Sequence, residues 1–189
     1  PYRCPPGPYE RACQVASYFK KAKPRSKVIV LDANEDVISK GPLFKAAWNN
    51  LYKGIIDYRN NAEAKDVDVA GRFVVTDFDK IKGDVLNVIP PMRAADIART
   101  SGLITANNRW CGVNWQTTQS EVDANIYILG DSTLSAPAMP KSGHMANQHG
   151  KTCAAAVVAL LSGRQPNALP IYNNACYSFV SDEDVVHVA

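Results

Sequence analysis

Hydrophobic residues recur with helical spacing in three parts of the chain. Small and apolar residues share one face between residues 9 and 21, and two lysines follow at the carboxyl end of this stretch. Residues 143–161 form an Ala- and Val-rich helical stretch, with Gly163 placed to end it. We also predict a helical stretch over residues 41–63, with a face formed by Leu43, Phe44, Ala47, Leu51 and Ile55.

Short apolar runs predict strands at residues 27–32, 72–76, 85–89 and 126–129. The first run ends at Asp32, and Pro90 and Pro91 end the third, where we place a domain boundary. Residues 94–101 predict a short helix, and residues 109–119 predict a loop or edge strand.

The stretch from residue 126 to residue 163 combines a strand, the pair Gly130 and Asp131, a polar loop and a helix. Such an arrangement can hold a ribitol or ribose hydroxyl on the carboxylate, and a partial negative charge on the N–H groups of the first helical turn. An ordinary β-α unit with a capping Asp has the same features and is the more frequent explanation. The pattern alone leaves both interpretations open.

The beginning of the chain has the order of a nucleotide-binding β-α-β unit whose first strand would precede residue 1. A turn is followed by a helix and then by a strand ending in Asp32. The glycine fingerprint of such units is missing, because residues 4–10 read CPPGPYE. This loop offers few N–H groups and no room for a pyrophosphate, so we expect the fold without the dinucleotide.

Composition narrows the classes of function. The 189 residues are 46% hydrophobic, which is typical of a folded globular protein. The net charge of +3 and the lack of a basic run with interleaved aromatics argue against nucleic acid as a partner. The longest apolar run, residues 154–161, is too short to cross a bilayer. The sequence begins without an initiator Met or a signal peptide, so we expect a piece of a longer protein.

The cysteines show no CxxC pair and no ligand spacing with the histidines, so no metal site is predicted. Cys13 and Cys153 lie in helical stretches, where a cysteine is usually a small buried hydrophobe. Cys4 and Cys176 lie beside turn-forming residues instead. Loops carry chemistry more often than cores do, which makes these two the candidates for reactivity.

Four strings carry a resemblance to a known family: CPPGPYERA at 4–12, VIPP at 88–91, GDS at 130–132 and MPKSGHMA at 139–146. Together they resemble the flavoprotein subunit of flavocytochrome c sulfide dehydrogenase, one of the disulfide-reductase-like flavoproteins. The resemblance implies an α/β fold. A Rossmann-like, three-layer, NAD-binding-like domain without its first strand would span residues 1–92. The C-terminal part of an FAD-binding domain would follow at 93–165, and a redox-cysteine loop with the start of an interface domain at 166–189.

The same resemblance implies FAD as cofactor, a redox-active cysteine pair, and a c-type cytochrome subunit that carries haem in the periplasm. By motif, Cys4 and Cys176 match the two redox cysteines. Gly130 and Asp131 match the turn whose acid holds the ribityl chain of the flavin. The helix start that faces the pyrimidine edge of the isoalloxazine matches Gly143 and His144, with two further cofactor-binding residues before them, Lys141 and Ser142.

The implied activity is sulfide oxidation. Hydrosulfide can attack a disulfide sulfur and leave a persulfide and a thiolate. Glu10, six positions after Cys4, is a candidate for moving a proton near the sulfurs, and a solvated acid at a helix start is an equally good interpretation. The region that would grip the ADP part of FAD is absent from these residues, so we expect the chain alone to bind FAD poorly and to be inactive.

Two alternatives remain open from the residues. One is a sulfide:quinone reductase, which would need an apolar quinone cleft and an amphipathic tail. The other is a non-catalytic α/β piece that keeps only the fold.

Overall fold

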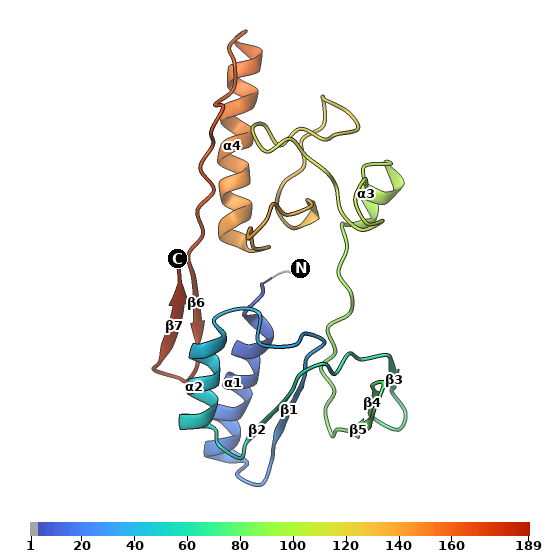
Figure 1. The fold of residues 1–189 in the computed structure, drawn as a ribbon, viewed down its shortest axis with the longest axis vertical. Coiled ribbons are helices and arrows are strands. Elements are labelled where there is room, and N and C mark those ends of the chain that lie inside the picture. The colour runs from blue at the N-terminus through green and yellow to red at the C-terminus, as the bar shows by residue number, and fades with distance from the viewer. Residues whose placement is uncertain (1–3) are drawn as a thin grey trace. The chain divides into compact units, whose positions relative to one another are not determined.

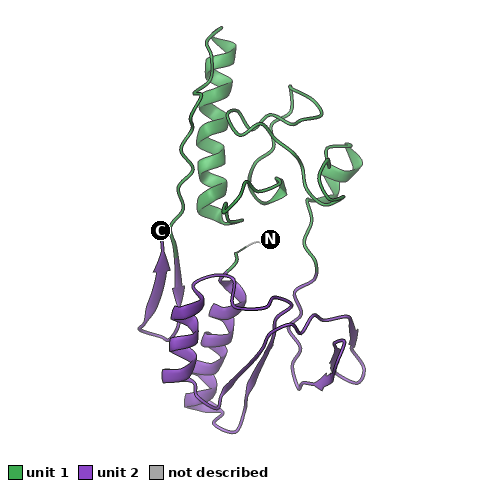
Figure 2. Cartoon of the chain, in the orientation of Figure 1, with its two compact units in different colours: residues 1–5, 91–176, 189 green, residues 6–90, 177–188 purple. Residues whose placement is uncertain are grey.

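The computed structural model describes residues 4–189 and confirms the predicted α/β class. The chain folds into two compact units, shown in different colours in Figure 2. Unit 1 holds residues 91–176 together with Cys4, Pro5 and Ala189, and unit 2 holds residues 6–90 and 177–188. The division into domains at 1–92, 93–165 and 166–189 stays a prediction.

Unit 2 is built on a parallel strand pair. Strands β1 (Val28–Leu31) and β2 (Ile56–Arg59) pair in register from Val28 opposite Ile56 to Leu31 opposite Arg59. Helix α1 (Gly7–Ala22) precedes the pair, and α2 (Gly41–Leu51) lies in the crossover that parallel strands require. Figure 1 shows the two helices side by side, next to these strands.

The helix predicted over residues 41–63 is too long. Helix α2 ends at Leu51, and residues in the second half of the predicted stretch form β2. Gly54 has a φ of +79°, a left-handed conformation that interrupts a right-handed helix. Ile56 and Tyr58 then pack against the core from the strand, so tertiary packing decides the structure of this segment.

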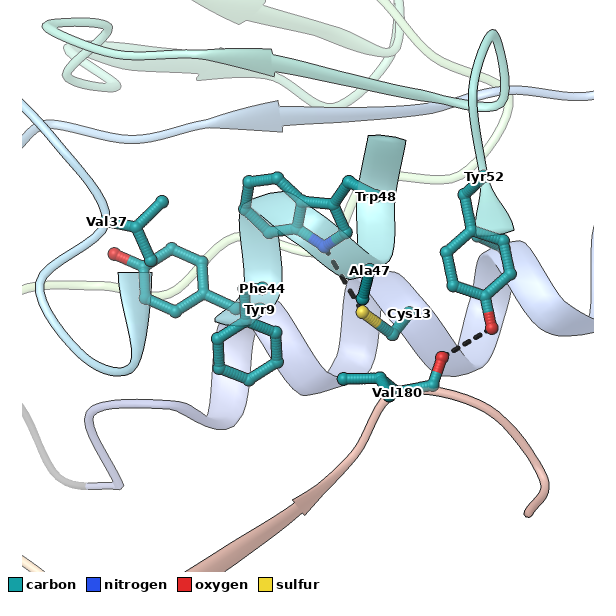
Figure 3. Packing of buried hydrophobic residues seen from close by; sticks show 9 residues of the cluster. Tyr9, Cys13, Val37, Phe44, Ala47, Trp48, Tyr52 and Val180 are labelled. Atoms are coloured by element: carbon teal, nitrogen blue, oxygen red, sulfur yellow. Dashed lines mark hydrogen bonds between the residues drawn. The ribbon is translucent and has the colours of Figure 1, made fainter. Parts of the chain in front are cut away.

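Figure 3 shows the core of unit 2, where α1 and α2 meet the end of β6 (Cys176–Phe179) and the turn after it. The indole N–H of Trp48 donates to the Cys13 sulfur at 3.2 Å, and the hydroxyl of Tyr52 donates to the Val180 carbonyl at 2.5 Å. The buried cluster comprises Tyr9, Cys13, Ala16, Val37, Phe44, Ala47, Trp48, Tyr52 and Val180. Burying this apolar surface is the main stabilising contribution to unit 2.

A three-stranded antiparallel sheet completes residues 6–90. Its strands are β3 (Asp66–Asp68), β4 (Phe73–Val75) and β5 (Lys80–Lys82), with β4 in the middle. The strand predicted at residues 72–76 is confirmed as β4. The strand predicted at residues 85–89 is wrong: this segment is irregular, and Val85 is 88% exposed. It has no ladder partner among the described residues, and apolar character alone does not make a strand.

Near its C-terminal end the chain forms a hairpin of β6 and β7 (Val185–Val188). The Val180 N–H donates to the Asp184 carbonyl at 2.9 Å and closes the turn. The Lys40 ammonium donates to the hydroxyl of Ser178, which is fully buried, at 2.8 Å. The residues that follow Cys176 are therefore firmly attached to α1 and α2 within unit 2.

Unit 1 contains α3 (Asp96–Thr100), a 3-10 turn η1 (Gly130–Ser132) and α4 (Gly143–Leu161). The short helix predicted at 94–101 and the long helix predicted at 143–161 are both confirmed. A second core lies under α3 and comprises Ala94, Ala98, Trp110, Cys111, Val113 and Ile128.

The strand predicted at residues 126–129 is wrong. The segment makes a single antiparallel bridge, between Tyr127 and Gln119, and the Ile128 N–H donates to the Thr118 carbonyl at 3.0 Å. This one bridge is not extended into a ladder, so residues 126–129 form no strand in the described part of the chain. The run is apolar because Ile128 is buried in the second core. In the part of the chain that the structure describes, no helix combines the length and apolarity needed to span a bilayer.

Candidate functional site at the start of helix α4

The amino-terminal end of α4 is open and well capped. Ser142 is the N-cap, and its hydroxyl accepts the Met145 N–H at 3.1 Å. The N–H groups of Gly143 and His144 lie in the first turn, where no carbonyl of the helix can accept them, and they point out of the helix end. A Cβ built on Gly143 would meet no atom within 4 Å, and His144 is exposed. This end can therefore stabilise a partial negative charge on an approaching group.

The turn η1 packs closely against α4. Gly130 has a φ of +65°, and a Cβ added there would lie 3.2 Å from the Ala146 Cβ. Its carbonyl accepts the Thr133 hydroxyl at 2.8 Å, and its N–H donates to His149 Nδ1 at 2.9 Å. A side chain at this position would be strained by the left-handed conformation and would press on Ala146. The turn thereby holds the partly exposed Asp131 beside the helix.

Lys141 connects η1 to the start of α4. Its side chain is buried, and its ammonium donates to the carbonyls of Asp131 at 2.9 Å and Thr133 at 2.5 Å. The ammonium also lies 3.9 Å from the ring centroid of Trp110, a cation–π contact. Burial lowers the pKa of Lys141, the charge of Asp131 partly opposes this effect, and the charge of Arg109 adds to it. Lys141 thus fixes the backbone of the turn.

Both candidate redox cysteines belong to segments that are bonded to the start of α4. The Cys4 N–H donates to the Lys141 carbonyl at 2.7 Å, and Cys4 is exposed with a φ of +47°. The Ser142 hydroxyl donates to Asn174 Oδ1 at 2.5 Å. The Ala175 N–H donates to His144 Nδ1 at 3.0 Å, directly before Cys176. Residues 141–144 thus hold the chain at Cys4 and the two residues preceding Cys176.

Two further cysteines have environments that suppress reactivity. Burial raises the pKa of Cys13 to about 11, with the Trp48 N–H opposing and the Glu10 charge adding to the shift. Burial also raises the pKa of Cys111, against the charge of Lys141. The thiolate is the reactive form of cysteine, so neither residue is suited to thiol chemistry.

Glu10 has a structural contact in unit 2. Its Oε1 accepts the N–H of Phe179 at 2.9 Å, which joins the first turn of α1 to β6. The carboxylate therefore fixes the strand that starts at Cys176. The structure does not place it as a purely solvated acid.

Asp32, which ends β1, has both carboxylate oxygens engaged. One oxygen accepts the hydroxyls of Tyr9 at 2.7 Å and Tyr58 at 3.0 Å. The other accepts the backbone and side-chain N–H groups of Asn34 at 3.0 and 2.7 Å. In a nucleotide-binding unit an acid in this place holds the ribose, whereas here both oxygens of Asp32 accept hydrogen bonds from the protein. The expectation of a fold without the dinucleotide stays a prediction.

His149, Trp115 and Tyr172 are site residues that the sequence reasoning missed. His149 is 2% exposed and lies beneath η1, with its ring 5.0 Å from Trp115 and 5.5 Å from Tyr172 between centroids. A signal was present, because His149 follows the buried Met145 by four positions and so lies on the same helical face. Its contact with Gly130 could not be read from spacing.

The first part of the chain matches a known protein family. Residues 1–90 match the family model of the sulfide dehydrogenase (flavocytochrome c) flavoprotein chain, central region. The resemblance seen in the sequence is confirmed over this range. The range includes Cys4 and Glu10, whereas Asp131, the start of α4 and Cys176 lie beyond it.

Solved structures show a similar fold over almost the whole chain. The sulfide:quinone oxidoreductase of Aquifex aeolicus matches with a TM-score of 0.75 at 14% identity, covering 95% of this chain and 50% of that one. A FAD-dependent pyridine nucleotide-disulphide oxidoreductase of Desulfovibrio vulgaris matches with a TM-score of 0.57 at 15% identity, covering 88% and 44%. A chain of the Tetrahymena thermophila mitochondrial ATP synthase matches with a TM-score of 0.67 at 19% identity, covering 93% and 44%.

The chain spans half or less of the length of these three structures. At such identities the likeness shows the fold, which is that of FAD-dependent oxidoreductases.

Proposed function

We propose that the chain is part of a flavin-dependent sulfide dehydrogenase in which Cys4 and Cys176 form the redox-active pair. The observation that carries the proposal is the set of hydrogen bonds from residues 141–144 to Cys4 and to Asn174 and Ala175. The family match over residues 1–90 supports sulfide as the substrate.

The residues present fit a flavin. The open helix start offers the N–H groups of Gly143 and His144 to a polar ring edge that gains negative charge. Asp131, carried on a turn that Lys141 fixes, offers a carboxylate to a hydroxyl of a ribityl chain. A bound flavin would supply a two-electron acceptor, and a c-type cytochrome partner would take the electrons one at a time.

The chemistry of the cysteines follows thiol–disulfide exchange. Hydrosulfide attacks one sulfur of the Cys4–Cys176 disulfide, so that a new S–S bond forms as the old one breaks. The products are a persulfide on one cysteine and a thiolate on the other, which means that the sulfide sulfur is oxidised while the disulfide is reduced. Glu10 remains our candidate for moving a proton near the sulfurs, and its bond to Phe179 gives it the additional task of holding β6.

The test compares sulfide-dependent bleaching of flavin absorbance in the flavin-loaded protein and in two variants. Cys176→Ser should abolish bleaching, because no disulfide can form. Cys153→Ser, which changes a partly buried cysteine on α4, should bleach at the normal rate. Peptide mapping by mass spectrometry should find Cys4 linked to Cys176 in the untreated protein. Normal bleaching in Cys176→Ser would overturn the mechanism.

The electron acceptor separates two flavoenzyme functions. The likeness to the Aquifex aeolicus enzyme makes a quinone the second candidate. If the sulfide-treated protein reduces a c-type cytochrome and does not reduce a short-chain quinone, the result supports the dehydrogenase. We propose a periplasmic location together with the cytochrome partner. A chain that binds no flavin and keeps both cysteines reduced would instead be a non-catalytic α/β piece.

A further inference from the structure

A buried imidazole supports the turn that carries Asp131. His149 lies on the buried face of α4 and packs against the rings of Trp115 and Tyr172, which also contact each other. Its Nδ1 accepts the Gly130 N–H at 2.9 Å, and its Nε2 lies 3.3 Å from the sulfur of Met139. An accepting Nδ1 carries no proton, so the ring proton of the neutral form is on Nε2.

The attachment of η1 has three parts. His149 holds the N–H at the first residue of the turn, and Lys141 holds the carbonyls of Asp131 and Thr133. The third part is the close approach of Gly130 to Ala146. Of these two side chains, His149 is the one bonded to the Leu129–Gly130 peptide, one peptide before Asp131. It therefore constrains how the backbone enters the turn that carries the carboxylate.

We propose that His149 is a positioning residue that orients Asp131 toward the ribityl chain of FAD through the Gly130 N–H. This inference rests on the proposed flavin site and extends it to a residue that does not touch the cofactor. The neutral ring is the active form, because a protonated Nδ1 would be a donor facing another donor.

Two variants separate the hydrogen bond from the packing. His149→Leu keeps an apolar side chain of moderate size and removes the acceptor. His149→Asn places Oδ1 at the same number of bonds from the backbone as Nδ1, so it restores an acceptor for the Gly130 N–H. If His149→Leu does not fold, as judged by circular dichroism, His149→Asn compared with wild type still tests the inference.

The first readout needs no flavin. Hydrogen exchange of the Gly130 amide, followed by NMR in the full chain, should accelerate by about tenfold or more in His149→Leu and stay near the wild-type rate in His149→Asn. Equal exchange of Gly130 in wild type and His149→Leu would overturn the inference.

The second readout is the dissociation constant for FAD, measured by quenching of flavin fluorescence in the whole flavoprotein of which we propose this chain to be a part, because we expect the chain alone to bind FAD poorly. We expect binding about tenfold weaker in His149→Leu than in wild type, with most of the affinity recovered in His149→Asn. If wild type binds FAD and His149→Leu binds it equally well, the positioning role of His149 is overturned and the proposed function stays intact. Wild type that binds no FAD would overturn the flavin site itself and this inference with it.

Discussion

Two buried side chains near the start of α4 form hydrogen bonds with the backbone of the turn η1. Lys141 and His149 both direct their polar atoms at the turn η1 from buried positions. Sequence motifs indicated Lys141 and the pair Gly130 and Asp131, but they gave no reason to choose His149. The reason is that a buried hydrogen bond between positions 130 and 149 leaves no mark on local spacing.

Gly130→Ala should lower the free energy of unfolding by about 2–3 kcal/mol. A left-handed φ costs an L-residue about 1–2 kcal/mol, and the new methyl group would press on Ala146 at 3.2 Å. Gly163→Ala is the matched control, because Gly163 has a φ of +68° and open space around it. Gly163→Ala should lower the free energy of unfolding only by the cost of the left-handed φ. Equal losses of stability in urea unfolding would contradict the packing argument.

At the scale of elements, α4 was predicted well because its signals are local. Ser142 and Gly163 mark its two ends in the sequence, and the structure places them as N-cap and as a left-handed residue after the last turn. The run at 85–89 was predicted wrongly because strand formation needs a partner. That partner depends on residues far away in sequence.

Ser142 connects the cap of α4 to the segment before Cys176, and two variants can separate these roles. Ser142→Ala should cost about 1 kcal/mol of stability by removing the cap of Met145. Ser142→Asp keeps an acceptor for Met145 but cannot donate to Asn174 Oδ1. Hydrogen exchange should therefore accelerate at Met145 only in the Ala variant and at Ala175 in both. Protection of Ala175 in both variants would show that the bond from Ser142 to Asn174 does not order this segment.

For the molecule as a whole, His149 should make stability depend on pH. Burial lowers the pKa of His149 below its usual 6.5, the charge of Lys141 adds to the shift and that of Asp131 opposes it. The unfolded chain therefore takes up a proton near pH 6.5 while the folded chain does not. Above that pH, His149 is neutral in both the folded and the unfolded chain, so it does not change how the free energy of unfolding depends on pH. Below it, stability should fall by at most about 1.4 kcal/mol per pH unit from this group.

Urea unfolding at pH 7.5 and pH 5.5 measures this dependence. Between pH 7.5 and pH 5.5, the free energy of unfolding of His149→Asn should fall less than that of wild type. The reason is that an asparagine at this position does not titrate in that range. An unchanged difference between the two pH values in His149→Asn would mean that another group causes it.

The sequence by itself determined α1, α4 and β1, the placement of Cys4 and Cys176 next to turns, and the resemblance later matched over residues 1–90. Each depends on caps, periodicity or short strings, which act between residues close along the chain. Only the tertiary structure decided that residues 141–144 form hydrogen bonds with Cys4 and with residues 174 and 175. It also decided that tyrosine hydroxyls donate to the carboxylate of Asp32. These contacts join positions from 23 to 137 apart. Chain topology fixes such contacts, and no local preference encodes them.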